Sequence, residues 1–195
     1  MNFVEPIRST RKIAQIKNLL KGAGRCRDLL LFVVGINTAL RVSDLLALCV
    51  GDFFEDDRTI RERFWIHEQK RGKRREVIVN ASMREALERY RAAYPEAVAR
   101  PAHALFFNTR TRDYTYPIDR RQAWEVIRQV CQDVGLNGNY GTHSLRKTWG
   151  YHARLNGVDL VLIMHQLNHN DLAYTKRYLG ITDEELEAVV RRLNL

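Results

Sequence analysis

The sequence has few cysteines, few prolines and no long hydrophobic run. Cys26, Cys49 and Cys131 lie far apart without a Cys-x-x-Cys pair, which argues against a disulfide framework or a cysteine zinc site and predicts buried thiols. No apolar run approaches the ~20 residues of a membrane span. The first six residues lack the apolar stretch of a signal peptide. We therefore expect a cytoplasmic protein with no membrane contact.

What the chain does have is enough apolar sequence for a core and an excess of positive charge. At 195 residues and 45% hydrophobic it fits one domain. Its 32 Lys and Arg against 23 Asp and Glu give a formal charge of +9. Such a charge indicates a polyanionic partner, either nucleic acid or anionic lipid, without choosing between them.

The apolar spacing predicts a mostly helical chain with one small antiparallel sheet, an α+β fold. Arg41 falls in the turn between an all-round apolar helix, from Asp28 to about Leu40, and a short helix capped by Ser43. β-formers over 59–66 and 76–79 around Gly72 predict one hairpin. The other predicted helices begin at Ser9 or Thr10, at the capping box Ser82–Glu85, at Asp119, and at the starts of 142–155, 158–167, 171–179 and 183–194.

One pair of residues in the predicted helix 142–155 suggests an anion site. His143 and Arg146 are three apart, so they share a helix face and converge on one anion. Such a pair alone is more often a solvated surface feature. Its context differs, because Arg41 lies in the upstream turn and Leu167-Asn168-His169 ends a later helix, with Tyr178 nine residues after His169.

The order and spacing of these motifs resemble the tyrosine recombinase (phage integrase) family over roughly residues 5 to 185. The resemblance implies a site-specific recombinase that breaks and rejoins DNA through a 3′-phosphotyrosine. It implies that Arg41 and Arg146 are the two catalytic arginines and that His143 is the histidine paired with Arg146. It also implies that His169 holds the family's later His/Trp position, that Tyr178 is the nucleophile and that Asp44 is a supporting acid.

The chemistry explains these residue types. A covalent phosphotyrosine stores the phosphodiester bond energy, so we expect no metal, ATP or other cofactor. Two guanidiniums stay charged at any working pH and brace the non-bridging oxygens. Cations nearby help a phenol with a reference pKa of ~10 to ionise. Either His143 or His169 accepts its proton or binds the phosphate, and the sequence leaves that choice open.

The predicted hairpin turn supplies a proton donor for the leaving 5′-oxygen. Five of the six residues from Lys70 to Arg75 are cationic. The family carries a catalytic lysine just before the turn glycine, and Lys70 matches that position better than Lys73. The alternative is a solvated turn that contacts only phosphates. The residues predicted to contact DNA phosphates are Arg71, Lys73, Arg74, Arg75 and Lys147.

Several alternatives stay open at this point. Asn168 stands where the family usually has glycine, a position that favours positive φ. Tyr174 is a rival nucleophile at a less suitable interval, and His165 with His169 has the spacing of a zinc pair but lacks an evident third ligand beyond His152. An inactive DNA-binding module with this fold and a type IB topoisomerase are the alternative functions.

The resemblance also implies partners and a domain organisation. We expect double-stranded DNA as substrate and a homo-oligomer, a tetramer on paired sites, formed through the helix at 183–194, although that helix can equally pack within its own chain. The chain is expected to be a single catalytic domain over 1–195, with a core of about 5–180 and no N-terminal core-binding domain. The sequence leaves open whether the chain is a fragment or a natural short form. It also leaves open the target site, the reaction direction and whether Tyr178 acts in cis or in trans.

Overall fold

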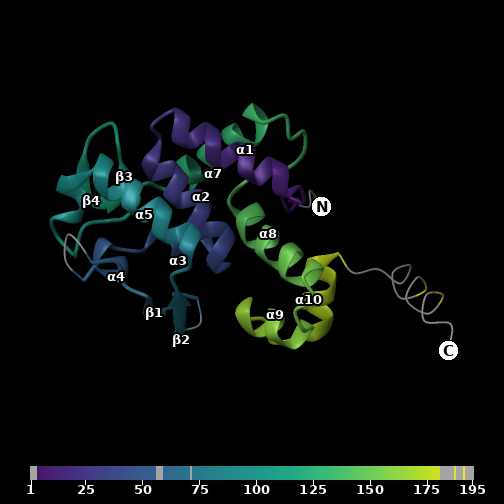
Figure 1. The fold of residues 1–195 in the computed structure, drawn as a ribbon. Coiled ribbons are helices and arrows are strands. Elements are labelled where there is room, and N and C mark those ends of the chain that lie inside the picture. The colour runs from purple at the N-terminus through teal and green to yellow at the C-terminus, as the bar shows by residue number, and fades with distance from the viewer. Residues whose placement is uncertain (1–3, 56–58, 71, 181–186, 188–190, 192–195) are drawn as a thin grey trace.

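The computed structural model describes residues 4–55, 59–70, 72–180, 187 and 191. Within them the chain is mainly helical, as expected, with short antiparallel strands (Figure 1). The elements in order are α1 (Thr10–Gly22), α2 (Cys26–Thr38), α3 (Val42–Leu46), α4 (Val50–Phe53), β1 (Arg63–His67), β2 (Arg74–Ile78), α5 (Ala81–Ala93), α6 (Pro95–Val98), β3 (Phe107–Asn108), β4 (Asp113–Pro117), α7 (Arg120–Asp133), α8 (Thr142–Leu155), α9 (Leu160–Gln166) and α10 (Leu172–Leu179).

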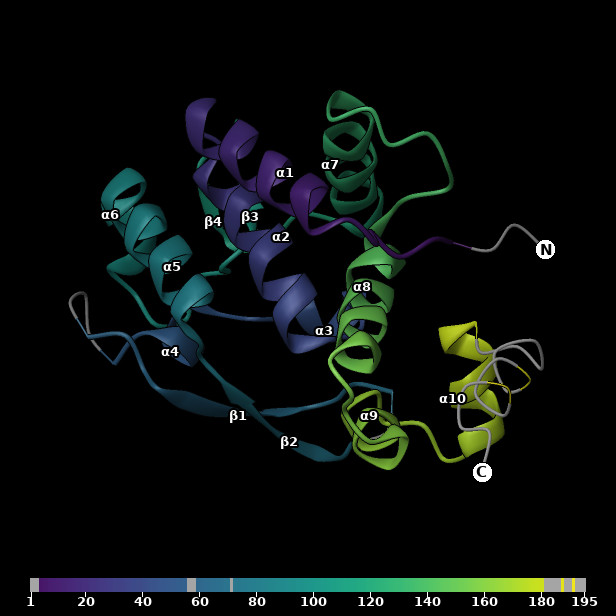
Figure 2. The same cartoon turned by 45° about the vertical axis from the view of Figure 1, so that its right-hand side comes forward.

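Helix α2 forms the centre of the core. Its apolar run from Leu29 to Val34 is buried on every side, because α5, α8 and α1 all pack against it (Figure 2). Ala39, directly after α2, has the left-handed φ of 55°, and this turn ends the helix and places Arg41 at the N-cap of α3. The buried helix thus fixes the first candidate arginine.

Helix starts confirm some of the predicted caps and correct others. The Ser9 side chain caps α1, and Asp119 and Gln122 form a capping box at α7. Ser43 is not the cap of α3, because Arg41 holds that position. The predicted Ser82 box is also wrong: Asn80 caps α5 by accepting a hydrogen bond from the backbone N–H of Met83.

The structure has two hairpins where the sequence predicted one sheet. β1 pairs with β2, with His67 opposite Arg74, and β3 pairs with β4. β1 begins at Arg63, later than predicted, because Ile60 forms only an isolated bridge with Phe54. Figure 2 shows the β1–β2 hairpin running beneath α2 and α3 toward α9. The hairpin turn therefore reaches the region of His169.

Two other expectations concern thiols and the chain's C-terminal end. Cys131 is buried, whereas Cys26 and Cys49 are only partly buried. No helix in the described part of the chain has both the length and the apolar character needed to cross a membrane. The predicted helix at 183–194 lies outside the described residues.

Candidate active site

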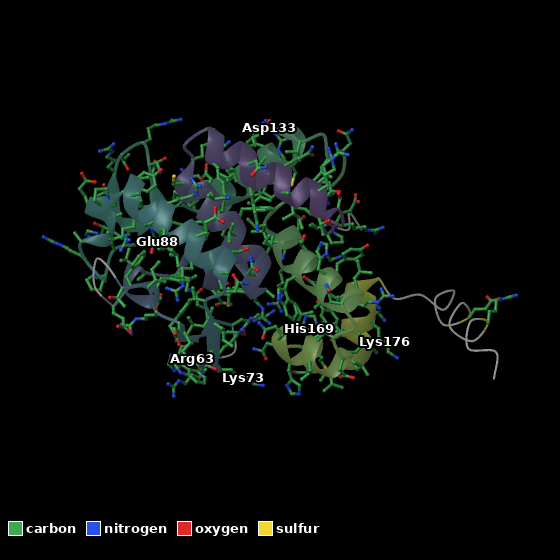
Figure 3. The ribbon with its side chains drawn as sticks, viewed as in Figure 1. Arg63, Lys73, Glu88, Asp133, His169 and Lys176 are labelled. Atoms are coloured by element: carbon green, nitrogen blue, oxygen red, sulfur yellow. The ribbon has the colours of Figure 1, made fainter. Side chains whose placement is uncertain are left out.

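A cavity of about 750 Å³ gathers the candidate catalytic residues. They come from the turn before α3, from the β1–β2 turn, from α8, from the loop after α9 and from α10. In Figure 3, His169 is labelled between the β1–β2 hairpin and the pair of helices α9 and α10, and Lys73 lies on the hairpin at the edge of the molecule. The six candidates that line the cavity are Arg41, Lys70, His143, Arg146, His169 and Tyr178.

Arg146 is fixed by backbone carbonyl groups. Its side chain on α8 is 5% exposed, and Nη1 donates to the Ala39 carbonyl at 2.6 Å while Nη2 donates to the Leu167 carbonyl. These bonds tie the end of α2 to the end of α9. Desolvation by burial, aided by the charges of Arg41 and Arg75, lowers the pKa of Arg146 from its ordinary value. The Arg41 guanidinium therefore lies near that of Arg146 although the two positive charges repel each other.

Arg41 is held by a buried carboxylate that the sequence did not single out. Its Nη1 lies 2.6 Å from Oε2 of Glu68, which is 1% exposed. Burial raises the pKa of Glu68, but hydrogen bonds from Asn168 and Arg41 outweigh it, so the pKa falls below its ordinary value. Glu68 is therefore ionised at neutral pH. Asn168 has the positive φ of 45° that its place in the sequence suggested.

Tyr178 is tucked against the cationic residues. Its hydroxyl oxygen is buried and interacts with the Arg146 guanidinium, although no hydrogen bond of ordinary geometry joins it to the described residues. Burial raises the pKa of Tyr178 to about 12, although the charges of Arg146 and Arg41 act in the opposite direction. The Lys147 ammonium lies 5.2 Å from the centre of the Tyr178 ring. The phenol is therefore neutral in this state and surrounded by the charges that stabilise its phenolate.

The two histidines differ in how they are held. Nδ1 of His169 lies 3.0 Å from the hydroxyl of Thr175, a fully buried residue, and its ring packs edge-on at 5.1 Å from that of Tyr178. His143 lies in the first turn of α8, where desolvation and then the charge of Arg146 lower its pKa. At neutral pH His143 is therefore an uncharged imidazole that can accept a proton.

The cationic hairpin divides into exposed and buried charges. Lys70 and Lys73 are exposed, and only Lys70 lines the cavity. Arg74 stacks over Trp65, with Cζ 4.2 Å from the ring centre. Arg75 was expected to be an exposed cation that contacts phosphate. It is instead turned inward, because it donates to Glu68 and to the Thr38 carbonyl. Arg71 lies outside the described residues.

Asp44 supports the hairpin turn through a backbone contact. The side chain is 3% exposed, and Oδ1 accepts a hydrogen bond of 2.9 Å from the backbone N–H of Gln69. Gln69 is the neighbour of Lys70 in the turn. Asp44 therefore anchors the turn that carries the candidate proton donor to the helix that follows Arg41.

The rival residues are placed as well. Tyr174 also lines the cavity, 53% exposed, with its ring stacked at 6.4 Å from that of Tyr178. It lies closer to solvent than Tyr178. Among the described residues, no three His, Cys, Asp or Glu side chains come together in a group that could hold a metal ion.

Comparisons with known proteins give the family. Residues 10–185 match the phage integrase family. The chain is 36% identical over 191 residues to the probable integrase/recombinase YoeC of Bacillus subtilis (strain 168), covering 98% of this chain and 97% of that protein. It is 28% identical to the tyrosine recombinase XerD of Corynebacterium glutamicum over 85% of this chain, but spans only 52% of that relative.

Solved structures show the same fold. The crystal structure of XerA recombinase superposes with a TM-score of 0.75 at 21% identity, over 100% of this chain and 66% of that chain. The XerH recombinase bound to a palindromic difH substrate, in a post-cleavage complex, gives 0.71 at 19% identity, over 99% and 54%. Because the family match covers most of its length, the chain belongs to the phage integrase family of tyrosine recombinases.

Proposed function

We propose that this chain is a site-specific DNA recombinase that cuts and rejoins strands through a 3′-phosphotyrosine formed on Tyr178. The observation that carries the proposal is that one cavity brings together the six candidate catalytic residues, Tyr178, Arg41, Arg146, His143, His169 and Lys70, from five separate segments. An arrangement of cations around one phenol fits attack on a phosphodiester, whose charge grows in the transition state.

The proposed reaction assigns a role to five of the six groups. The Tyr178 oxygen attacks the scissile phosphorus, while Arg41 and Arg146 bind the non-bridging oxygens. His143, neutral because its pKa is lowered, accepts the proton that Tyr178 loses as its oxygen attacks. Lys70 protonates the departing 5′-oxygen. The P–O bond to the 5′-oxygen breaks as the bond to tyrosine forms, so the reverse reaction rejoins the strand without an added energy source.

Trapping the covalent intermediate tests this function. The protein is incubated with nicked duplexes that tile the DNA flanking its own gene, so that a short cleaved strand diffuses away and the adduct accumulates. We expect an adduct with the wild type and none with Tyr178→Phe, which loses only the attacking oxygen and keeps DNA binding. Tyr174→Phe is the matched control, because its ring lines the same cavity. An adduct kept by Tyr178→Phe and lost by Tyr174→Phe would assign the nucleophile to Tyr174.

The same assay separates the alternative functions. DNA binding without an adduct from any duplex would indicate a binding module with the recombinase fold. Relaxation of supercoiled plasmid by a monomer, without paired sites, would indicate a topoisomerase of type IB.

We also propose the substrate, assembly and location. The substrate is double-stranded DNA in the cytoplasm, and residues 183–194 join protomers into a tetramer on paired sites. The support is the +9 charge and an apolar stripe in the sequence of that segment at Leu186, Val189, Val190 and Leu193. Deleting 183–194 should keep cleavage at a single site and abolish the slowly migrating paired-site complex. A paired-site complex that survives the deletion would contradict this role.

A further inference from the structure

We propose that Glu68 is a positioning residue that holds Arg41 in the geometry needed to bind the scissile phosphate. The inference rests on the proposed function. The observation behind it is a buried carboxylate at the junction of three segments that each carry a candidate catalytic residue.

The contacts of Glu68 use both carboxylate oxygens. Oε2 accepts from Nη1 of Arg41 at 2.6 Å and from the side-chain amide of Asn168, and Oε1 accepts from Nη1 of Arg75 at 3.3 Å. The side chain is 1% exposed, so water competes little for these bonds. Charge-assisted hydrogen bonds from two guanidiniums to one buried carboxylate fix the orientation of all three groups.

The local charge explains why a carboxylate is needed. Arg41, Arg75 and Arg146 are crowded together, and the charge of Arg41 lowers the pKa of both other arginines. Glu68 acts in the opposite direction on Arg75 and Arg146. A neutral residue at this position removes the attraction and leaves the repulsion, so Arg41 would turn away from the other two arginines.

Glu68 also links segments that are distant in sequence. It lies two residues before Lys70 in the hairpin, and Asn168 directly precedes His169. The amide of Asn168 reaches the carboxylate because its backbone takes the left-handed conformation, with φ of 45°. A glycine there would keep the backbone turn and lack the amide. Asparagine therefore adds a connection from the His169 loop to the partner of Arg41.

The first test needs no DNA. A guanidinium held by a carboxylate rotates slowly, so NMR should resolve separate Nη–H signals for Arg41 in the wild type, assigned by their loss in Arg41→Lys. In Glu68→Gln we expect these signals to collapse to a single exchanging one. Glu76→Gln is the matched control, because Glu76 lies on the same hairpin and pairs with exposed Arg63 at 3.4 Å. Unchanged Arg41 signals in Glu68→Gln would overturn the proposal.

The second test asks whether the defect lies in the handling of phosphate charge. Glu68→Gln should slow adduct formation about 100-fold on ordinary DNA, as expected for a displaced catalytic contact, with DNA affinity nearly unchanged. A methylphosphonate at the mapped scissile position replaces one charged oxygen by a methyl group. The transition state then carries less negative charge for Arg41 to stabilise. On that substrate, wild type and Glu68→Gln should differ by only about threefold. Equal losses on both substrates would show that Glu68 only maintains the fold.

If Glu68→Gln does not fold, a milder variant, Asn168→Gly, provides the test. Asn168→Gly keeps the positive φ and removes one hydrogen bond to Oε2, so it should slow cleavage roughly fivefold on ordinary DNA, with the same recovery on methylphosphonate. No slowing in Asn168→Gly and no change in its Arg41 NMR signals would count against the proposal. If the wild type forms no adduct with any duplex, the proposed function fails, whereas the NMR comparison still decides whether Glu68 positions Arg41.

Discussion

At the scale of single residues, Tyr178 carries a measurable cost of ionisation. Burial raises its pKa to about 12 in the folded protein, against about 10 in an unfolded chain. Above pH 10 the unfolded state therefore loses this proton first, and the stability that the neutral buried phenol contributes is lost as pH rises toward 12. Tyr178→Phe removes the titrating group and with it this dependence.

Urea unfolding at two pH values checks that sign. Relative to Tyr178→Phe, we expect the wild type to lose about 1.4 kcal/mol of unfolding free energy between pH 8 and pH 11. At pH 8 the two proteins should differ by less than about 1 kcal/mol, because the lost hydroxyl makes no hydrogen bond of ordinary geometry to the described residues and interacts only with Arg146 and Arg41. A constant difference at both pH values would show that the phenol titrates normally.

Residue spacing predicted the candidates but not their partners. Arg41, Arg146 and Tyr178 were recognised because the order of motifs along the chain is visible without a structure. Glu68 was missed, since it begins a run of charged residues that is typical of a solvated turn. Its burial arises from α3 and the loop after α9, which are remote in sequence. The same packing draws Arg75 inward, so local polarity could not separate it from exposed Arg74.

At the scale of elements, the β1–β2 turn should divide proton transfer from DNA affinity. Lys70 lines the cavity and Lys73 does not. A proton donor acts only in the transition state, whereas a phosphate contact contributes to affinity and to its salt dependence. We therefore expect Lys70→Ala to slow cleavage far more than it weakens binding, and Lys73→Ala to do the reverse, with adduct rates and binding curves at several salt concentrations as the measurements.

A modified substrate provides the control for that hairpin. Sulfur in place of the leaving 5′-oxygen departs without a proton, so it should restore cleavage to Lys70→Ala. Equal losses for both lysines on ordinary DNA, with no recovery on the sulfur substrate, would make the hairpin an electrostatic clamp and place the general acid elsewhere.

The start of α5 offers a separate test of stability. Asn80 caps the helix through Met83 and also donates to Asn37 at 2.7 Å, whereas Ser82 lies inside the first turn. Asn80→Ala should lower the unfolding free energy by about 1 kcal/mol, measured by urea unfolding. Ser82→Ala should change it by less than about 0.5 kcal/mol. A larger loss of stability in Ser82→Ala than in Asn80→Ala would show that Ser82 is the cap, as the sequence pattern predicted.

Elements with strong local signals were predicted well, and short ones were not. α8 has the predicted bounds, and α7 begins directly after the predicted start at Asp119, because caps and apolar stripes are encoded within the segment. α4, α6 and the β3–β4 hairpin are too short for a period to show. They form because other parts of the chain satisfy their backbone groups, as when the Val50 N–H at the start of α4 donates to the His103 carbonyl.

At the scale of the whole molecule, the fold was predictable because helix α2 is apolar on all sides and demands helices around it. The arrangement of the site was not, since it depends on how the hairpin and the loop after α9 close over the turn before α3. Charge links the two scales: the chain is +9 overall, and the cavity concentrates cations where the phosphate is proposed to bind.

This arrangement predicts cleavage and rejoining that need neither a metal ion nor ATP. The phosphate charge is met by the fixed guanidiniums of Arg41 and Arg146, and the phosphotyrosine keeps the bond energy for rejoining. Adduct formation and religation should therefore proceed at unchanged rates, within about twofold, after dialysis against EDTA and without nucleotide. Strict dependence on Mg²⁺ or Zn²⁺ would reject this chemistry and direct attention to the spacing of His165 and His169. A step that requires ATP would mean that the covalent intermediate does not conserve the bond it replaces.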